Sequence, residues 1–252
     1  MPLLEAVEPL APARPLRLAG LGRLLWALAR TGQAMGTLGL GAPRDATLSV
    51  WSRHLLASLR IRVEVEGPLP SGAVLWTANH LSWIDPLVLL SLRPMGVLAK
   101  REVADYPFLG PAAARAGLCF VEREDPLSRA AALVGVVREL RRGRPFLIFP
   151  EGTTTRGHHL ARVHEGGLLA AHRLGLPTLP IRLDCEAPHY PWIGDESLLP
   201  HLRKLAAEAP LTVQLRPGPV LDPGTLQDPY EWLARVRGHL APRQSTFLES
   251  PI

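Results

Sequence analysis

Two kinds of hydrophobic pattern alternate along the chain. Short apolar runs rich in β-branched and aromatic residues predict strands, and they lie near residues 60–66, 73–77, 96–99, 117–121, 145–149, 178–183 and 211–215. Apolar residues at helical spacing predict helices, near residues 48–59, 87–92, 126–140 and 165–174 and after residue 228. Strands that alternate with helices across short turns predict an α/β fold, with a mixed, mainly parallel central sheet flanked by helices.

Proline and glycine mark where several of these helices begin and end. Proline suits the first turn of a helix, and an aspartate before it suits the N-cap. This pair occurs at Asp85-Pro86, Asp125-Pro126 and Asp228-Pro229, so each aspartate is predicted to cap a helix. Gly143 stands where the helix begun at Asp125 should stop. Residues 107–116 are small and predict either a helix or a loop.

The first sixty residues have a different character from the rest. No Asp or Glu occurs between Pro9 and Arg44, whereas arginines recur and leucines follow helical spacing beside Trp26. Over residues 16–40 this pattern is typical of a basic amphipathic helix on an anionic bilayer surface. The alternative is an ordinary helix that covers the core. We therefore divide the chain into an N-terminal amphipathic helical segment, 1–60, and an α/β domain, 61–252.

Composition narrows the class of partner. The 252 residues carry a net charge of +5 and a sequence pI of about 9.8, which favours anionic partners such as lipid headgroups or phosphorylated metabolites. No nucleic-acid-binding module is recognisable, so we expect no nucleic-acid partner. Two cysteines give no disulfide framework. The sequence contains no continuous apolar run of about 20 residues, the length that would predict a membrane-spanning helix. Among 28 basic residues only Lys100 and Lys204 are lysines, which draws attention to Lys100.

Polar residues follow three of the predicted strands. They are His80 with Asp85, Glu122 with Arg123, and the segment 151–156. Loops at the carboxyl ends of strands are where α/β proteins place reactive groups. These three loops are therefore the candidate functional residues.

The spacing of His80 and Asp85 permits a catalytic pair. On a helix the two side chains would lie about 140° apart. In a turn that folds back, the carboxylate can fix the imidazole tautomer and leave the other nitrogen as a base. The alternative is an aspartate that only caps and a histidine that only packs. The segment 151–156 contains a glycine, hydroxyls and an arginine, which together suit the binding of an anionic group. The alternative is that this segment is only a solvated turn. For Arg123 the alternative is a surface ion pair.

The motifs together resemble a known family. Asn79 to Asp85 resembles the His-x4-Asp motif of the 1-acyl-glycerol-3-phosphate acyltransferases, and Phe149 to Thr153 resembles that family's third block. The segment 117–123 resembles its second block, and 179–181 its fourth. All four occur in the family's order between about residues 75 and 183. The combination is far more specific than the His-x4-Asp motif alone.

This resemblance implies an enzyme that moves a fatty acyl group from acyl-CoA or acyl carrier protein to the hydroxyl of a lysophospholipid. The acceptor it implies first is 1-acyl-glycerol-3-phosphate, giving phosphatidic acid. It implies no metal, no cofactor beyond the donor thioester and no covalent acyl-enzyme. It also implies a peripheral or monotopic location on the cytoplasmic face of a membrane.

The resemblance also implies roles for individual residues. His80 would be the general base and Asp85 would orient it. Arg123 would hold the acceptor's phosphate. The remaining candidates are Glu151, Gly152 and Thr153, which would shape the acceptor pocket, and Lys100 and Arg156, as further phosphate ligands.

Departures from the family pattern leave the acceptor open. Thr154 stands where many members have an arginine, and Val163-His164 stands where a Phe-Lys pair is common. The segment 192–195 looks similar to members that acylate lyso-ornithine lipid, which is the alternative acceptor. Three other classes are alternatives: a metallohydrolase, a serine hydrolase and a non-catalytic membrane-binding protein. The metallohydrolase would use His80, Asp85 and some of His158, His159, His164 and His172. No metal-ligand motif supports the metallohydrolase. A serine hydrolase would need a Gly-x-Ser-x-Gly turn, which the sequence lacks.

Overall fold

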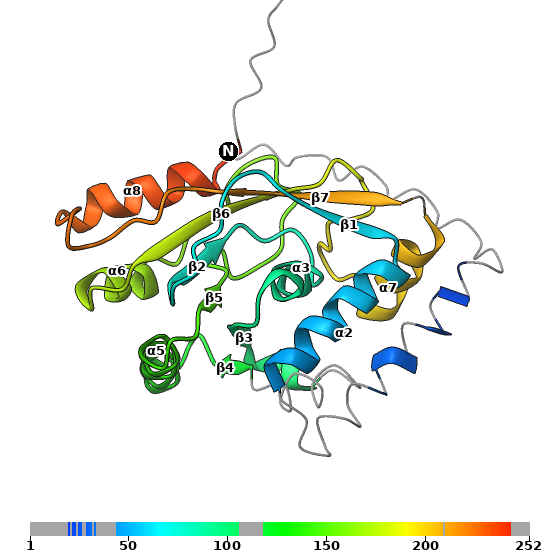
Figure 1. Ribbon diagram of the computed structural model, residues 1–252, viewed down its shortest axis with the longest axis horizontal. Coiled ribbons are helices and arrows are strands. Elements are labelled where there is room, and N and C mark those ends of the chain that lie inside the picture. Colours follow the sequence, from blue (N-terminus) through cyan, green and yellow to red (C-terminus); the bar gives the residue numbers. More distant parts are fainter. Residues whose placement is uncertain are drawn as a thin grey trace, which may run out of the picture.

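The computed structural model describes residues 44–105, 118–208 and 210–242, together with scattered residues between 20 and 33. The predicted α/β fold is confirmed. Seven strands form one sheet, in the order β1-β7-β6-β2-β5-β3-β4 (Figure 1). They are β1 (Ile61–Val65), β2 (Leu75–Ala78), β3 (Gly96–Lys100), β4 (Cys119–Val121), β5 (Phe146–Ile148), β6 (Thr178–Asp184) and β7 (Leu211–Pro217).

The sheet is mixed and mostly parallel. All neighbouring strands pair in parallel except β6 and β7, which pair antiparallel. The strands β2, β5, β3 and β4 therefore end at the same edge of the sheet. That edge carries the three polar loops identified in the sequence, because each follows one of these strands.

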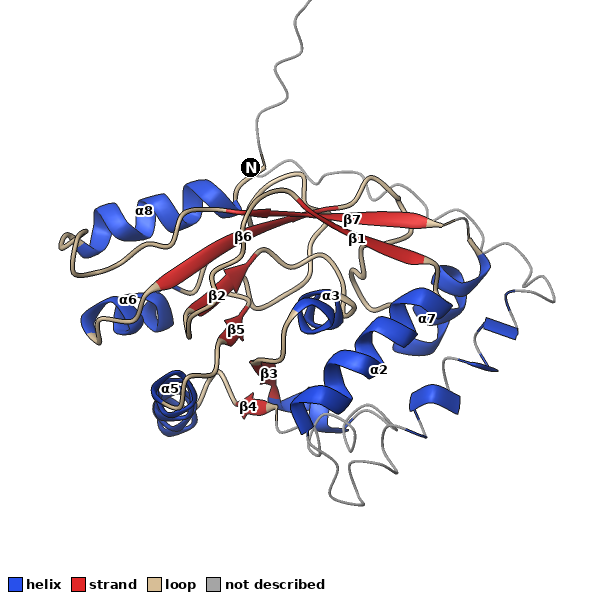
Figure 2. Ribbon diagram, viewed as in Figure 1, coloured by secondary structure: helices blue, strands red, loops and turns tan. Residues whose placement is uncertain are grey.

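Helices cover both faces of the sheet (Figure 2). On one face lie α2 (Arg44–Ser58), α3 (Asp85–Leu92) and α7 (Leu198–Ala207). They share a single apolar cluster with the strands, which includes Leu56, Leu89 and Leu205. On the other face lie α5 (Pro126–Arg141), α6 (Glu165–Arg173) and α8 (Pro229–Leu240), which pack in two further clusters. A short 3-10 helix, η1 (Arg101–Asp105), follows β3.

The three Asp-Pro pairs do not behave alike. Asp125 and Asp228 are N-caps as predicted, because the side chain of each accepts a backbone N–H of its helix. The prediction for Asp85 is wrong. The N-cap of α3 is Ile84, and the Asp85 carboxylate turns back to the loop before the helix. Helix α7 was not predicted.

Most of the predicted amphipathic segment 16–40 lies outside the described residues, as does the predicted helix or loop 107–116. The described residues between 20 and 33 are helical. Arg23 Nε donates to the Ala206 carbonyl over 3.0 Å, and Trp51 Nε1 donates to Thr31 Oγ1 over 3.2 Å. These contacts hold that part of the chain against α7 and α2. Among the described residues, no helix is both long and apolar enough to cross a membrane.

A buried asparagine joins two strands beside the first polar loop. Asn79 follows β2, and its Nδ2 donates to the Leu183 carbonyl over 2.9 Å. Its Oδ1 accepts the Leu183 N–H over 2.6 Å. The asparagine thus continues the pairing of β2 with β6 by one residue and fixes the point at which His80 leaves the sheet.

Asn79→Ala should therefore lower the free energy of unfolding by about 2–4 kcal/mol, since it leaves a buried N–H and a buried carbonyl without partners. Chemical denaturation of the two proteins measures this difference. A loss below about 1 kcal/mol would contradict this role for the asparagine.

Candidate active site

The first polar loop folds back so that its histidine and aspartate meet. His80 Nδ1 lies 2.8 Å from Asp85 Oδ2. The aspartate side chain is fully buried, whereas 17% of the histidine side chain is exposed. The pair therefore places a buried carboxylate behind an imidazole that reaches the surface of a cavity. This is the pairing that the spacing permits.

Two backbone N–H groups determine which ring nitrogen of His80 carries the hydrogen. Asp85 Oδ2 accepts from Leu81 N over 2.6 Å and from Ser82 N over 2.9 Å. Amide N–H groups only donate, so this oxygen acts as an acceptor and His80 Nδ1 must carry a hydrogen. The other ring nitrogen, Nε2, is then the one with a free lone pair.

The loop is tied to two other segments of the chain. His80 N donates to Glu151 Oε1 over 2.8 Å, and Thr155 N donates to the His80 carbonyl over 2.8 Å. Trp192 N donates to the Leu81 carbonyl over 2.9 Å. The imidazole also stacks on the Phe149 ring, with 4.1 Å between centroids and 18° between planes. The position of His80 is therefore fixed by both its backbone and its ring.

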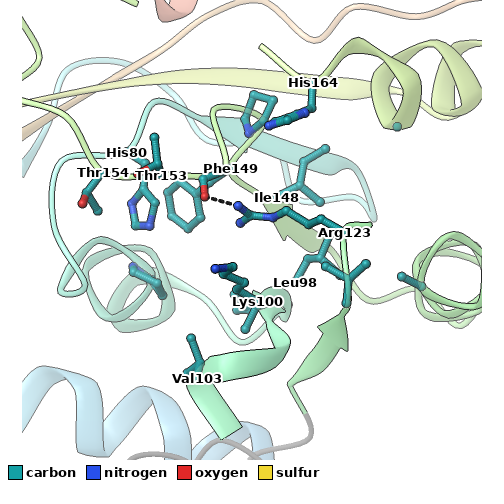
Figure 3. A pocket seen from close by; sticks show the side chains of 18 of the residues that line it. His80, Leu98, Lys100, Val103, Arg123, Ile148, Phe149, Thr153, Thr154 and His164 are labelled. Atoms are coloured by element: carbon teal, nitrogen blue, oxygen red, sulfur yellow. Dashed lines mark hydrogen bonds between the residues drawn. The ribbon is translucent and has the colours of Figure 1, made fainter. Parts of the chain in front are cut away.

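His80 borders a cavity of 1760 Å³ at the carboxyl edge of the sheet. Figure 3 shows His80, Lys100 and Arg123 around one space, each from a different strand-to-loop transition. The lining also contains apolar side chains from α2, α3 and α5, such as Trp51, Leu87 and Leu133, together with further charged side chains. The further arginines are Arg129, Arg162 and Arg237. The cavity thus combines several charged side chains with apolar wall residues.

Arg123 is held against a glycine. Its Nη1 donates to the Gly152 carbonyl (Figure 3). Gly152 has a φ of +69°, and a Cβ there would lie 2.8 Å from Arg123 Nη1. Glycine is therefore required both for the backbone conformation and for the approach of the guanidinium. Burial lowers the pKa of Arg123 from its usual value, which still leaves it a cation at neutral pH.

The other predicted site residues occupy different positions. Thr153 and Lys100 line the cavity, and Lys100 Nζ lies 2.5 Å from Glu102 Oε1. Glu151 is buried behind the His80 loop, where its second oxygen accepts Ala161 N over 2.9 Å, and burial raises its pKa. Arg156 is exposed and is not among the described residues that line the cavity.

The structure adds site residues that the sequence did not reveal. Tyr190 donates its hydroxyl to Asp85 Oδ1 over 2.7 Å. Trp83, from the His80 loop, donates its Nε1 to His201 Nδ1 on α7 over 2.8 Å. These contacts join residues more than a hundred positions apart, so no local spacing could have indicated them.

The described residues contain no group of three or more His, Cys, Asp or Glu placed to hold a metal ion. One of the histidines considered for such a site, His172, instead lies near Leu226, with its Nε2 2.9 Å from that carbonyl. The site as described holds an imidazole oriented by a carboxylate, a guanidinium and apolar wall residues.

Comparison with known proteins agrees with this geometry. The Acyltransferase family matches residues 60–184. A lyso-ornithine lipid O-acyltransferase of Pseudomonas aeruginosa is 35% identical over 206 residues, covering 78% of each chain. A 1-acyl-sn-glycerol-3-phosphate acyltransferase of Neisseria meningitidis is 34% identical over 176 residues, covering 66% of this chain and 67% of that one.

The fold agrees as well. The crystal structure of the 1-acyl-sn-glycerophosphate acyltransferase PlsC from Thermotoga maritima superposes with a TM-score of 0.62 at 19% identity, covering 88% of this chain and 94% of that one. The sequence similarity to curated acyltransferases over most of the chain is what decides the family. The protein belongs to the acyltransferase family and is an acyltransferase enzyme.

Proposed function

We propose that the protein moves a fatty acyl group from the thioester of acyl-CoA or acyl carrier protein to the hydroxyl of a lysolipid. The observation that carries the proposal is the His80–Asp85 pair at 2.8 Å on the wall of a cavity with both polar and apolar parts. The imidazole beside charged side chains can accept the hydroxyl proton of a lysolipid whose headgroup those side chains bind. The apolar wall residues of the cavity can contact acyl chains.

The residues account for a balanced reaction. His80 Nε2 takes the proton of the acceptor hydroxyl as its oxygen attacks the thioester carbonyl. The tetrahedral intermediate then breaks its C–S bond, and the thiolate takes the proton back from the imidazolium. An ester and a free thiol result. Asp85 holds the imidazole in place and stabilises its positive charge, because its carboxylate stays beside Nδ1 throughout.

The cations of the cavity give the headgroup its position. Arg123 and Lys100 line the same space as His80 (Figure 3). A guanidinium binds phosphate or carboxylate through paired hydrogen bonds. We assign Arg123 to the acceptor's anionic group, with Lys100 as a further cation and with Gly152 and Thr153 on the adjoining wall.

For the acceptor we favour a zwitterionic lysolipid of the lyso-ornithine type over 1-acyl-glycerol-3-phosphate. An ornithine headgroup with an acylated α-amino group keeps one carboxylate and one ammonium. The cavity offers a partner for each, because its lining includes Asp195 as well as Arg123. Asp195 is exposed and has no ion-pair partner among the described residues. The relative from Pseudomonas aeruginosa supports the same choice, through its name and its similarity over 78% of the chain.

Thiol release from acyl-CoA, measured with each lysolipid in turn, tests the proposed reaction. The protein should release thiol with lyso-ornithine lipid, and His80→Ala should lower kcat by about 10²–10⁴-fold, the usual contribution of a general base. His158→Ala, which changes an exposed histidine elsewhere, is the matched control. Full activity in His80→Ala would reject the mechanism, and release with 1-acyl-glycerol-3-phosphate alone would reject the favoured acceptor.

Asp195→Asn tests the assignment of the ammonium partner. Because the carboxylate is exposed, its loss should lower kcat/KM for lyso-ornithine lipid by only about three- to fivefold. It should not lower kcat/KM for 1-acyl-glycerol-3-phosphate, which carries no cation. Glu64→Gln removes an exposed carboxylate on β1, away from the cavity, as the control. Equal changes with both acceptors would refute the assignment.

We further propose that the N-terminal segment binds the membrane surface from which the acceptor is taken, as a peripheral contact. Within that segment Leu25 and Trp26 are 58% and 46% exposed. The Arg30 guanidinium lies 5.5 Å from the Trp26 ring centroid. Large apolar side chains beside an arginine suit an anionic interface. In this proposal the part of the segment 1–60 that precedes α2 makes the membrane contact, while α2 packs on the catalytic domain 61–252.

The double variant Leu25→Asp/Trp26→Asp should bind about tenfold more weakly to vesicles of phosphatidylethanolamine and phosphatidylglycerol, since it removes two apolar side chains from the interface. Leu174→Asp, at a half-exposed leucine that follows α6, is the matched control. Co-sedimentation measures the bound fraction. Equal binding of the double variant and the unmodified protein would reject the membrane contact.

A further inference from the structure

A tyrosine hydroxyl bonds the oxygen of the Asp85 carboxylate that the histidine does not contact. Tyr190 is fully buried. Its hydroxyl donates to Asp85 Oδ1 over 2.7 Å. The reaction described above makes no use of this group, so its presence beside a buried charge needs an explanation.

The two oxygens of Asp85 are supported differently. Oδ2 accepts from His80 Nδ1 and from the N–H groups of Leu81 and Ser82, all within the same loop. Oδ1 accepts from Tyr190, which is 105 residues further along the chain. The local loop thus holds one oxygen, and among the described residues the tyrosine holds the other. The two together set the plane of the carboxylate.

The segment that carries the tyrosine is joined to the active-site loops. Tyr190 N donates to the Ala187 carbonyl over 3.0 Å, which forms a turn after β6. Trp192 N donates to the Leu81 carbonyl over 2.9 Å, and Thr154 Oγ1 donates to the Trp192 carbonyl. The hydroxyl therefore comes from a segment that is fixed relative to both the His80 loop and the loop after β5.

We propose that Tyr190 is a positioning residue for the acyl transfer, acting on His80 through Asp85. The inference rests on the proposed function of the His80–Asp85 pair. The hydroxyl keeps Oδ2 aligned with Nδ1 and withdraws part of the carboxylate's charge. Both effects change the basicity of the imidazole, because a less neutralised carboxylate stabilises the imidazolium more strongly.

The Tyr190 hydroxyl keeps its proton, and remains a donor, over the pH range of an assay. Burial and the neighbouring Asp85 raise the pKa of Tyr190 well above its usual value. Other titratable groups also face the pair. Glu151 accepts His80 N, and the Cys185 thiol, whose pKa burial raises to about 11, lies close enough to Asp85 to interact with it. Arg182 adds a positive charge near Glu151. These groups are unchanged by a substitution at Tyr190.

Tyr190→Phe removes the hydroxyl and keeps the ring. We expect kcat to fall about tenfold with little change in KM for either substrate, because the residue does not line the cavity. The acid limb of the pH–rate profile should move up by about half a pH unit, since the imidazolium is stabilised. Tyr230→Phe, whose ring is 71% exposed on α8, is the matched control.

An unchanged kcat and pH profile would overturn the proposal. A lower kcat with an unmoved acid limb would also overturn it, because it would show only a structural role. If Tyr190→Phe does not fold, 3-fluorotyrosine placed at position 190 decides the question. It keeps the packing and is a stronger donor, so the acid limb should move down, and an unmoved limb would reject the role.

The failure of this inference differs from the failure of the proposed function. If the unmodified protein releases no thiol with any lysolipid, the proposed function fails. The imidazole can then be titrated directly by NMR with labelled histidine, using His80→Ala to assign its signals. A His80 pKa that rises in Tyr190→Phe supports the influence of the tyrosine on the pair. An equal His80 pKa in the two proteins rejects it.

Discussion

A single buried carboxylate determines the arrangement of the active site. The Asp85 side chain has no exposed surface, and a buried charge is stable only when its lone pairs are taken up by donors. Those donors are the imidazole of His80, two N–H groups of its own loop and the hydroxyl of Tyr190. Meeting that requirement folds the loop back and directs the histidine towards the cavity.

The parallel part of the sheet then brings His80 and the residues proposed to bind the headgroup to the same place. Strands β2, β5, β3 and β4 end at one edge, so His80, Gly152, Lys100 and Arg123 meet although up to 72 residues separate them in sequence. Gly152 lets Arg123 pack against its backbone carbonyl, because a side chain there would occupy the space of the guanidinium. The site therefore depends on one local turn and on the order of the strands.

The sequence predicts the parts of this arrangement that follow from local pattern. The strands and the helix caps at Asp125 and Asp228 follow from spacing and residue type. The spacing of His80 and Asp85 only permits their contact, and the family resemblance predicts it. The prediction that Asp85 caps a helix was wrong because its carboxylate accepts N–H groups of the preceding loop. Tyr190 and the contact of Trp83 with α7 were missed because they depend on how distant segments pack. Of the predicted site residues, Glu151 lies behind the loop and Arg156 lies away from the cavity lining.

The tautomer of His80 tests the central role of Asp85 most directly. Nitrogen-15 NMR of histidine-labelled protein, with His80→Ala used to assign the resonances, distinguishes a protonated Nδ1 from a protonated Nε2. For the uncharged imidazole, the geometry predicts hydrogen on Nδ1 and a free lone pair on Nε2. Hydrogen on Nε2 and none on Nδ1 would contradict the assignment. In that tautomer Nδ1 could not donate to Asp85, and Nε2 would have no free lone pair with which to act as the base.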